Sequence, residues 1–192
     1  MSEPVFRPAR QEDCPDIAAL YRISSDGVAD YIWSKLAQPG ENPLDVGVRR
    51  YTREDTAFSY LNCTIIEHAE RVIGMLVAFP MHVDPAEVET DPVLAPYGKL
   101  EEDDSYYICG MALIPEYRGR GLGTRLLSLA EEQAGNKGFD KLSLIVFEQN
   151  DGARRLYARH GYREVARAAV YPHPLIHYTG NAILMVKDTK RD

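Results

Sequence analysis

A segment near the middle of the chain, residues 110–125, constrains the fold more than any other. Its sequence is Gly-Met-Ala-Leu-Ile-Pro-Glu-Tyr-Arg-Gly-Arg-Gly-Leu-Gly-Thr-Arg. An apolar run typical of a strand ends at Pro115, a glycine-rich turn follows over residues 118–123, and a helical pattern begins at once. This order leaves unpaired backbone N–H groups at the start of a helix, beside arginines. Such a site suits a phosphate or pyrophosphate group.

Two well-known phosphate-binding motifs do not match this turn. A dinucleotide fingerprint, G-x-G-x-x-G, requires a final glycine where the chain has Thr124. A Walker loop requires Gly-Lys followed by Ser or Thr, and the sequence contains no such run. For a lone glycine cluster, an ordinary strand-to-helix turn is an equally good interpretation. The adjacent arginines favour a binding site for another phosphorylated ligand.

Length and charge limit the number of domains and the kinds of partner. The 192 residues are enough for one domain with a substantial core, so we expect a single domain over residues 1–192. A net charge of -7 argues against a nucleic-acid partner. The longest apolar run, residues 72–81, contains Gly74 and Pro80 and is too short to span a bilayer, so we expect no membrane partner.

Cysteine usage and the first residues predict a cytoplasmic protein. The three cysteines, at positions 14, 63 and 109, are widely spaced and form no metal-binding pattern, and their odd number argues against a disulfide framework. Residues 1–4 do not begin a signal-peptide pattern. We therefore expect a cytoplasmic protein without a bound metal. The sequence leaves the oligomeric state open, a homodimer included.

The hydrophobic pattern predicts a chain of mixed helices and strands. Helices are expected over residues 13–22, 26–36, 46–60, 122–134 and 151–160. Strands are expected over residues 5–10, 63–67, 71–79, 106–113, 142–147, 165–170 and 182–186. Residues 63–79 form a predicted hairpin, residues 85–99 an exposed acidic loop, and residues 171–181 a long connection between the last two strands.

A second motif lies downstream of the glycine turn. Residues 150–162 read Asn-Asp-Gly-Ala-Arg-Arg-Leu-Tyr-Ala-Arg-His-Gly-Tyr. This segment and the run Arg118-x-x-Gly121-x-Gly123 resemble the two signature elements of the GCN5-related N-acetyltransferase (GNAT) family, the second being N-x-x-A-x-x-L-Y-x-x-x-G-F/Y. Both elements occur in the family's order, separated by a helix and a strand. The resemblance is clear over residues 105–164 and looser elsewhere.

The resemblance implies a fold, a co-substrate and a binding site. The fold would be mixed α/β, with a central, mostly antiparallel sheet flanked by helices and one splayed parallel pair of strands. The co-substrate would be acetyl-CoA, with pantetheine on the strand before the turn, where a backbone N–H would stabilise the oxyanion of the thioester. The residues that match the family's binding positions are Met111, Ala112, Leu113, Arg118, Gly119, Arg120, Gly121, Leu122, Gly123, Thr124 and Asn150.

Tyr157 is the predicted catalytic residue. It matches the family tyrosine near the sulfur, whose phenol can donate a proton to the departing CoA thiolate. The implied reaction is direct transfer of the acetyl group to a primary amine of a small molecule or peptide, within a ternary complex. Two alternatives stay open: Tyr157 is a packing residue, or the whole chain is an acyl-CoA-binding sensor without turnover.

The sequence does not identify the general base that an amine with a pKa of about 10 requires. The two strand positions where some family members carry a carboxylate hold Tyr107 and Ile145 here. Glu148 lies near the second of these positions, at the end of its strand. Deprotonation through water is an equal alternative. Further candidates, chosen by chemistry alone, are Glu67, His82, His173 and His177.

Three other features have a functional and a structural interpretation. Cys109 can be read as an acetyl carrier, but a buried and unactivated thiol is the preferred interpretation. Arginines in the last helical segment, at positions 154, 155, 159 and 163, can hold adenosine phosphates, but a solvated face is preferred. The acceptor pocket is expected where the chain is least family-like, and the fold alone does not identify the acceptor. These parts contain Tyr31, Trp33, Tyr60, Met81, His82 and residues 171–181.

Overall fold

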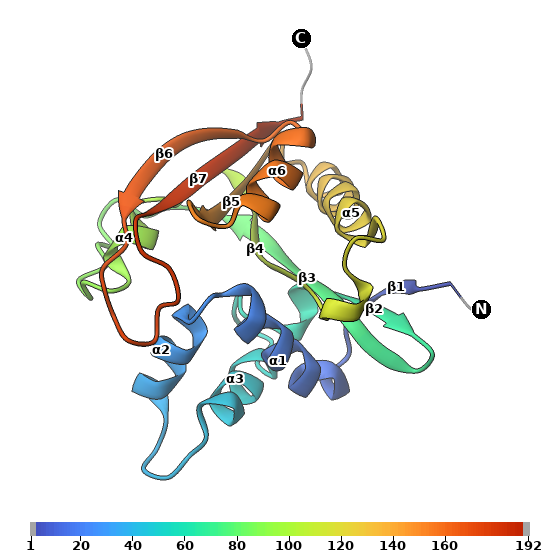
Figure 1. Ribbon diagram of the computed structural model, residues 1–192, viewed down its shortest axis with the longest axis horizontal. Helices are drawn as coiled ribbons and strands as arrows, with labels where there is room; N and C mark the ends of the chain where they lie inside the picture. The colour runs from blue at the N-terminus through green and yellow to red at the C-terminus, as the bar shows by residue number, and fades with distance from the viewer. Residues whose placement is uncertain (1–2, 190–192) are drawn as a thin grey trace. The chain divides into compact units, whose positions relative to one another are not determined.

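A computed structural model of the protein describes residues 3–189 (Figure 1). Residues 1–2, the start of the segment tested above for a signal-peptide pattern, and residues 190–192 lie outside the described part. The chain divides into two compact units. Unit 1 comprises Met1–Ala78 and Gly110–Leu126, and unit 2 comprises Phe79–Cys109 and Leu127–Asp192. The single domain expected over residues 1–192 stays a prediction.

Seven strands within residues 3–189 form one mixed sheet in the order β1-β2-β3-β4-β5-β7-β6. Strand β4 pairs in parallel with β5, from Tyr106 opposite Leu142 to Ile108 opposite Leu144. The pairs β1/β2, β2/β3, β5/β7 and β6/β7 are antiparallel. The predicted mixed α/β fold, with a mostly antiparallel sheet flanked by helices, is confirmed. The strands are β1 (Val5–Pro8), β2 (Cys63–His68), β3 (Arg71–Met81), β4 (Ser105–Leu113), β5 (Lys141–Phe147), β6 (Arg163–Ala169) and β7 (Asn181–Asp188).

Unit 1 packs three helices together, α1 (Cys14–Ser24), α2 (Val28–Leu36) and α3 (Pro43–Tyr51), as Figure 1 shows. Helix α3 has a clear start signal, because the Asn42 side chain accepts a hydrogen bond from the Leu44 N–H at 3.0 Å and Pro43 follows. Short 3-10 helices η1 (Gln11–Asp13), η2 (Tyr60–Asn62) and η3 (Pro115–Tyr117) join these elements to the strands. The unit's buried core includes Ile17, Leu20, Trp33, Val46, Tyr51, Ile65 and Ile73.

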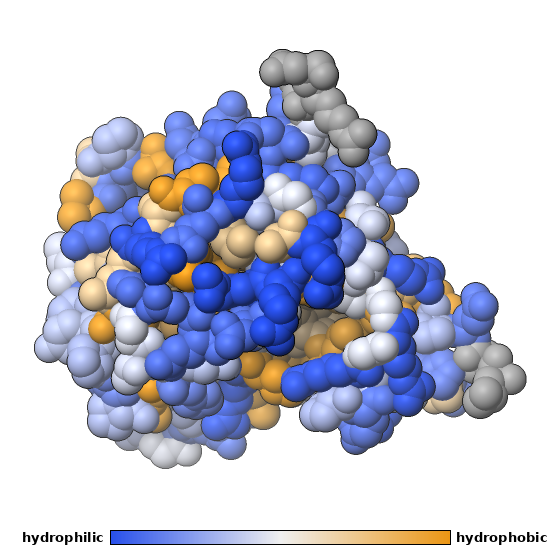
Figure 2. Space-filling view, turned by 45° about the horizontal axis from the view of Figure 1, so that its top comes forward, coloured by the Kyte–Doolittle hydropathy of each residue, from blue (hydrophilic) through white to orange (hydrophobic). Residues whose placement is uncertain are grey.

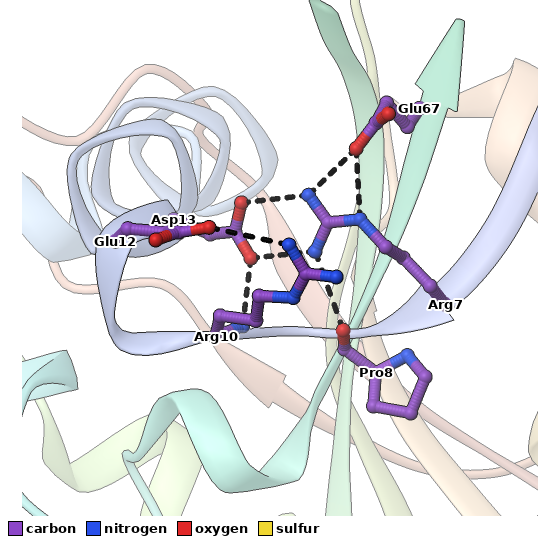
Figure 3. Close-up of polar contacts among 6 residues, drawn as sticks. All are labelled: Arg7, Pro8, Arg10, Glu12, Asp13 and Glu67. Carbon is purple, nitrogen blue, oxygen red and sulfur yellow. Dashed lines mark hydrogen bonds and ion pairs between the residues drawn. The ribbon is translucent and has the colours of Figure 1, made fainter. Parts of the chain in front are cut away.

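An arginine with two carboxylate partners ties the start of unit 1 together (Figure 3). Arg7 on β1 donates to the two carboxylate oxygens of Asp13 at 2.7 and 2.9 Å, and to Glu67 on β2 at 2.8 Å. The bond to Arg7 holds the pKa of Asp13 below its usual value, and the Arg10 N–H adds to the shift at 2.7 Å. The fold itself therefore neutralises Arg7, and Glu67 is engaged in an ion pair.

Unit 2 contains β5, β6, β7, helices α4 (Ala95–Gly98) and α6 (Asp151–Arg159), and most of α5 (Leu122–Asn136). Strand β5 is buried along most of its length, as its apolar sequence predicts for a central strand. Its one buried hydroxyl, Ser143 Oγ, lies 2.7 Å from Oγ of Ser105 on β4. This bond satisfies both polar groups inside the sheet.

The structure differs from the predicted elements in two places. Helix α3 ends at Tyr51, so the helix predicted over residues 46–60 is too long; the polar run after Tyr51 has no apolar face to pack. The acidic loop predicted over residues 85–99 contains the short helix α4. Buried Val93, Pro96 and Leu100 anchor that loop, although its charged residues are exposed.

The outer surface is mainly hydrophilic on the face drawn in Figure 2, with smaller hydrophobic patches between the polar residues. Exposed large hydrophobic residues include Val5, Leu61 and Val88. Within residues 3–189, no helix has both the length and the apolar character needed to cross a membrane.

Candidate active site

The glycine turn joins β4 to α5 within unit 1. Gly119 and Gly121 have φ angles of 73° and 78°, in the left-handed region that glycine adopts without strain. Both are exposed, and nothing lies within 4 Å of a Cβ placed on either. The Arg125 N–H donates to the Gly121 carbonyl at 3.2 Å, so the amides before Arg125 precede the helical ladder. The backbone of the turn is therefore open to a ligand at the positive end of the helix.

Three arginines surround this turn, and each is held by an uncharged partner. Arg118 donates through Nε to a backbone carbonyl at the end of β4 at 3.0 Å. The Arg120 guanidinium lies 4.9 Å from the centroid of the Tyr117 ring, and that of Arg125 lies 4.3 Å from the ring of Phe6. Within residues 3–189, none of the three forms an ion pair with a carboxylate. Their charge is available to an anion.

Tyr117, on which Arg120 stacks, is itself fixed by a histidine. Its hydroxyl lies 2.8 Å from Nδ1 of His68, at the end of β2, and donates the hydrogen bond when that nitrogen carries no proton. The two rings are 5.4 Å apart. The bond ties the β2–β3 hairpin to η3 and gives the guanidinium a fixed surface. Sequence reasoning missed both residues, because neither belongs to the family signature; the only signal was an aromatic residue beside the turn.

The predicted pantetheine-binding residues, 111–113, end strand β4. Ala112 is buried, whereas Met111 and Leu113 are partly exposed. The Ala112 carbonyl packs so closely on β3 that a Cβ added to Gly74 would lie 2.9 Å from its oxygen. The Ile114 N–H donates to a carbonyl of β3 at 3.0 Å. This close packing fixes the strand end that leads into the turn.

The start of α5 divides the remaining turn residues into buried and exposed ones. Leu122 is 4% exposed and packs inward, whereas Thr124 is exposed. Gly123 lies between them and is partly exposed. Leu122 can therefore contact a ligand only through its backbone.

Helix α6 in unit 2 holds the other two predicted site residues. The Asn150 side chain accepts a hydrogen bond from the Ala153 N–H at 3.3 Å and caps the helix. Tyr157 is partly exposed, and its ring centroid lies 6.0 Å from that of buried Tyr162. Burial raises the pKa of Tyr162, so this neighbour remains a neutral phenol. The ring of Tyr157 thus has a packing role, and the role of its hydroxyl stays a prediction.

Glu148, a candidate base, is engaged in the structure of unit 2. Its carboxylate accepts hydrogen bonds from the Asn181 side chain at 2.9 Å and backbone at 3.1 Å, and from Arg167 at 2.9 Å. The Asn181 bonds lower the pKa of Glu148. A carboxylate with a lowered pKa is a weak base. The contacts assign Glu148 to holding the long connection before β7.

Tyr107 and Glu101 differ from Glu148 because their pKa values are raised. The Tyr107 ring packs edge-on against Phe79 at 5.7 Å, and burial raises its pKa well above the usual 10, so it remains neutral. Burial also raises the pKa of Glu101, and the nearby Glu87 and Glu89 add to the shift. Glu101 follows the acidic loop predicted over residues 85–99 and was not among the candidates chosen from the sequence.

The other candidates have ordinary structural partners. The His82 ring lies 6.0 Å from that of Phe139, and His173 Nδ1 accepts a hydrogen bond from the Leu175 N–H at 3.2 Å. His177 is exposed. No group of three or more His, Cys, Asp and Glu residues within residues 3–189 is arranged to hold a metal ion.

The residues expected near the acceptor differ in burial. Trp33 is 2% exposed and belongs to the core. The Tyr60 hydroxyl donates to Glu54 at 2.5 Å, and the ammonium of Lys35 lies 5.3 Å from the Tyr31 ring centroid. Trp33 is therefore a wall residue at most, whereas the two tyrosines are partly exposed and His82 and Tyr171 are exposed.

Of the four arginines at positions 154, 155, 159 and 163, two have carboxylate partners, and within residues 3–189 Arg155 and Arg159 form no ion pair. Arg154 lies 3.7 Å from Asp151, and Arg163 lies 2.7 Å from Asp188. Arg167, on β6, pairs with Glu148. These contacts agree with the interpretation of this region as a solvated face.

Comparison with known sequences identifies the family. The sequence profile of the Acetyltransferase (GNAT) family matches residues 29–162. The chain belongs to the GNAT acetyltransferase family. The resemblance carried by the two motifs is confirmed, and the family is one of acyltransferase enzymes.

The curated relatives of this GNAT-family chain match it over short segments. An uncharacterized N-acetyltransferase, YycN, of Bacillus subtilis is 38% identical over 58 residues, which cover 30% of this chain and 37% of the relative. A mycothiol acetyltransferase of Corynebacterium aurimucosum is 43% identical over 29% of this chain and 18% of the relative. A thialysine N-epsilon-acetyltransferase of Mus musculus is 32% identical over 32% and 36%. The chain thus matches less than half the length of each.

Solved structures match the chain over almost its whole length. An N-acetyltransferase from Staphylococcus aureus Mu50 has a TM-score of 0.65 and 20% identity, and covers 95% of this chain and 99% of that one. A GNAT family acetyltransferase from Elizabethkingia anophelis, with acetyl-CoA bound, has a TM-score of 0.58 and 16% identity over 98% and 99%. At these identities the likeness concerns the fold alone.

Proposed function

We propose that this GNAT-family chain binds acetyl-CoA and transfers its acetyl group directly to a primary amine. The observation that carries the proposal is the group of three arginines without carboxylate partners at the start of α5. The pyrophosphate would bind the amides of residues 119–124 and these guanidinium groups, because a helix N-terminus and nearby cations both stabilise phosphate charge. The family's use of acetyl-CoA supports the choice of ligand.

The proposed chemistry needs little beyond positioning and two proton transfers. The amine nitrogen attacks the thioester carbonyl, a backbone N–H of residues 111–113 stabilises the oxyanion, and the C–S bond then breaks. Tyr157 donates a proton to the departing thiolate, and a base takes one from the amine. Asn150 would contact pantetheine with the part of its amide that does not cap α6.

Glu101 is the carboxylate best suited to the base. Its raised pKa makes it a stronger base than Glu148, whose pKa is lowered. Glu67 is held in an ion pair with Arg7. It also interacts electrostatically with Tyr107, at the strand position where some family members carry a carboxylate. Replacement of Glu101 by Gln would then lower kcat while leaving CoA affinity unchanged.

The same proposal covers the acceptor, the partners and the cellular location of the protein. The acceptor is a small-molecule or peptide amine, no metal, nucleic acid or membrane takes part, and a homodimer remains an open alternative to a monomer. Three widely spaced cysteines fit the reducing cytoplasm. Two relatives, a mycothiol acetyltransferase and a thialysine N-epsilon-acetyltransferase, are consistent with acetyl transfer to a small-molecule amine.

The proposal is tested by binding and turnover measured separately. Acetyl-CoA is titrated by calorimetry, and thiol release is then followed across a panel of primary amines. Failure to bind acetyl-CoA would contradict the proposal, and binding without turnover on any amine would favour a sensor. Tyr157→Phe should lower kcat and spare CoA affinity, because the ring is kept and only the proton donor is removed. Unchanged turnover would assign Tyr157 to packing.

A further inference from the structure

Arg50, near the end of α3, is a partly buried cation without a counter-charge. Its guanidinium lies 5.5 Å from the centroid of the Phe58 ring, and it forms no ion pair with any carboxylate in residues 3–189. Burial lowers the pKa of Arg50, and the charge of Arg53 lowers it further. The preceding residue, Arg49, is exposed and lies 3.3 Å from Glu41. Of these two adjacent arginines, the exposed Arg49 therefore has a carboxylate partner and the partly buried Arg50 has none.

A guanidinium removed from water is normally compensated by a carboxylate, because an uncompensated charge is costly to bury. Arg7, the other partly buried arginine described in unit 1, has two such partners, Asp13 and Glu67. Arg50 has aromatic neighbours instead, including the rings of Tyr21 and Tyr51, which interact with it electrostatically. A ligand with a negative charge would supply the counter-charge that Arg50 lacks.

The rings beside Arg50 connect it to the end of β4. The Tyr21 ring centroid lies 6.3 Å from that of Phe58 and 5.6 Å from that of Tyr51. On its other side, Tyr21 lies against Gly110, since a Cβ at that glycine would be 3.0 Å from Cδ2 of the tyrosine. Gly110 immediately precedes residues 111–113, the proposed position of the thioester. All of these residues belong to unit 1.

We propose that Arg50 binds a carboxylate of the acceptor, so that the acceptor is a small amino acid-like molecule with a primary amine and a carboxylate. This inference rests on the proposed acetyl transfer. Guanidinium and carboxylate groups form two parallel hydrogen bonds, and a guanidinium stacked on Phe58 keeps its edge available for them. The single positive charge matches a monoanion better than a phosphate dianion. The Tyr21 ring would line the path between the carboxylate and the amine at β4.

The experiment compares matched acceptors that differ only in charge. Linear ω-amino acids from glycine to 6-aminohexanoate are each paired with the corresponding ω-amino amide, and thiol release from acetyl-CoA gives kcat/KM for every member. The wild type should prefer the carboxylate by about 10- to 100-fold, mainly through KM, as expected for hydrogen bonds between charged groups. Arg50→Met, of similar length but uncharged, should abolish the preference, and Arg50→Lys should keep part of it.

Controls separate this inference from folding and from the proposed function. Arg49→Met removes the neighbouring exposed arginine and should leave the preference intact. CoA affinity, measured by calorimetry, should be the same in all variants, which shows that they are folded. Equal kcat/KM for both members of every pair, or a preference that survives Arg50→Met, would overturn the inference while acetyl transfer stands. Failure of the wild type to bind acetyl-CoA would overturn the proposed function, and this inference with it.

Discussion

The arginines beside the glycine turn and those at the end of the chain are equally charged, but their surroundings differ. Arg118, Arg120 and Arg125 in unit 1 contact a carbonyl and two aromatic rings. In unit 2, Arg154 and Arg163 contact carboxylates. The first group keeps its positive charge available for a ligand, whereas in the second region the fold neutralises Arg154 and Arg163 but leaves Arg155 and Arg159 without an ion pair in residues 3–189.

This difference shows that the number of basic residues alone does not identify a candidate anion site, because carboxylates neutralise part of the arginines in residues 154–163 and none of those in residues 118–125. Both segments are arginine-rich in sequence, and residues 154–163 contain more arginines than residues 118–125. An arginine held by an aromatic ring is oriented without being neutralised. Four experiments probe the comparison, in order of decreasing expected effect.

The largest effect is expected from neutralising the turn. The triple variant Arg118→Gln, Arg120→Gln and Arg125→Gln should weaken CoA binding about 100-fold, because charge-assisted hydrogen bonds to the pyrophosphate are lost. Pantetheine, which lacks that group, should bind with unchanged affinity. Calorimetry with CoA and with pantetheine measures the two changes in affinity.

The matched control for the turn is Arg163→Gln in unit 2. Its exposed pair with Asp188 contributes at most about 1 kcal/mol to stability, and CoA affinity should not change. Equal loss of CoA affinity in the triple variant and in this control would contradict the distinction between the two groups.

Asp13→Asn tests how much a fully paired arginine contributes to the stability of the fold. The Asp13 side chain is 6% exposed and receives two hydrogen bonds from Arg7, so the variant should lose about 2 kcal/mol of unfolding free energy at pH 7. Because the folded state lowers the pKa of Asp13, this stability is present above the unfolded pKa of about 3.9 and is lost as pH falls through the folded value.

Urea unfolding at several pH values measures this effect. The difference between wild type and Asp13→Asn should shrink below about pH 4. The exposed pair of Glu12 with Arg10, at 3.3 Å, offers a control, since Glu12→Gln should change stability by less than about 1 kcal/mol. A gap that persists at low pH would show that the effect does not come from the ionised carboxylate.

Gly121→Ala tests the backbone of the turn, and Gly138→Ala is its matched control. The two glycines have φ angles of 78° and 81°, and neither has an atom within 4 Å of the added Cβ. Both substitutions should therefore lower stability by a similar amount, about 1–2 kcal/mol. Only Gly121→Ala should also weaken CoA binding, by roughly 10-fold, as the amides of the turn shift. Thermal unfolding and calorimetry separate the two effects.

The smallest effect is expected at Tyr117. Tyr117→Leu removes the ring beneath Arg120 and should weaken CoA binding by about 2- to 5-fold, the value of an exposed cation–π contact. Tyr117→Phe keeps the ring but loses the bond to His68, and should have a smaller effect. If both variants bind CoA as the wild type does, Arg120 does not depend on this surface.

Local patterns predicted the strands, most helices and the two motifs, because glycine turns, caps and alternating apolar residues act over a few positions. The start of α5 and the cap at Asn150 were recognised in this way. The partners of the arginines were not predicted. Arg7 pairs with Glu67 on a different strand, and Arg50 contacts Phe58, which lies beyond the end of α3. Contacts between residues distant in sequence decide which arginines are neutralised.

The same reasoning explains why the sequence did not point to Glu101, the carboxylate proposed above as the base. The carboxylates that sequence position favoured, Glu148 and Glu67, are held by arginines, whereas burial changes the acidity of Glu101. A pattern of charges does not reveal which carboxyl group has its pKa raised by desolvation and by neighbouring carboxylates. Only the packing of Val93, Pro96 and Leu100 brings part of the acidic loop inward.

A longer acidic segment, residues 84–104, contains that loop and also affects how copies of the protein interact with one another. Residues 84–104 contain eight Asp and Glu residues and one Lys, a net charge of -7, which equals that of the whole chain. The rest of the sequence is therefore electroneutral. Electrostatic repulsion between molecules in solution opposes aggregation, and here it depends on the charge of this segment. A variant with these carboxylates replaced by amides would have its isoelectric point near neutrality and would lose colloidal stability there.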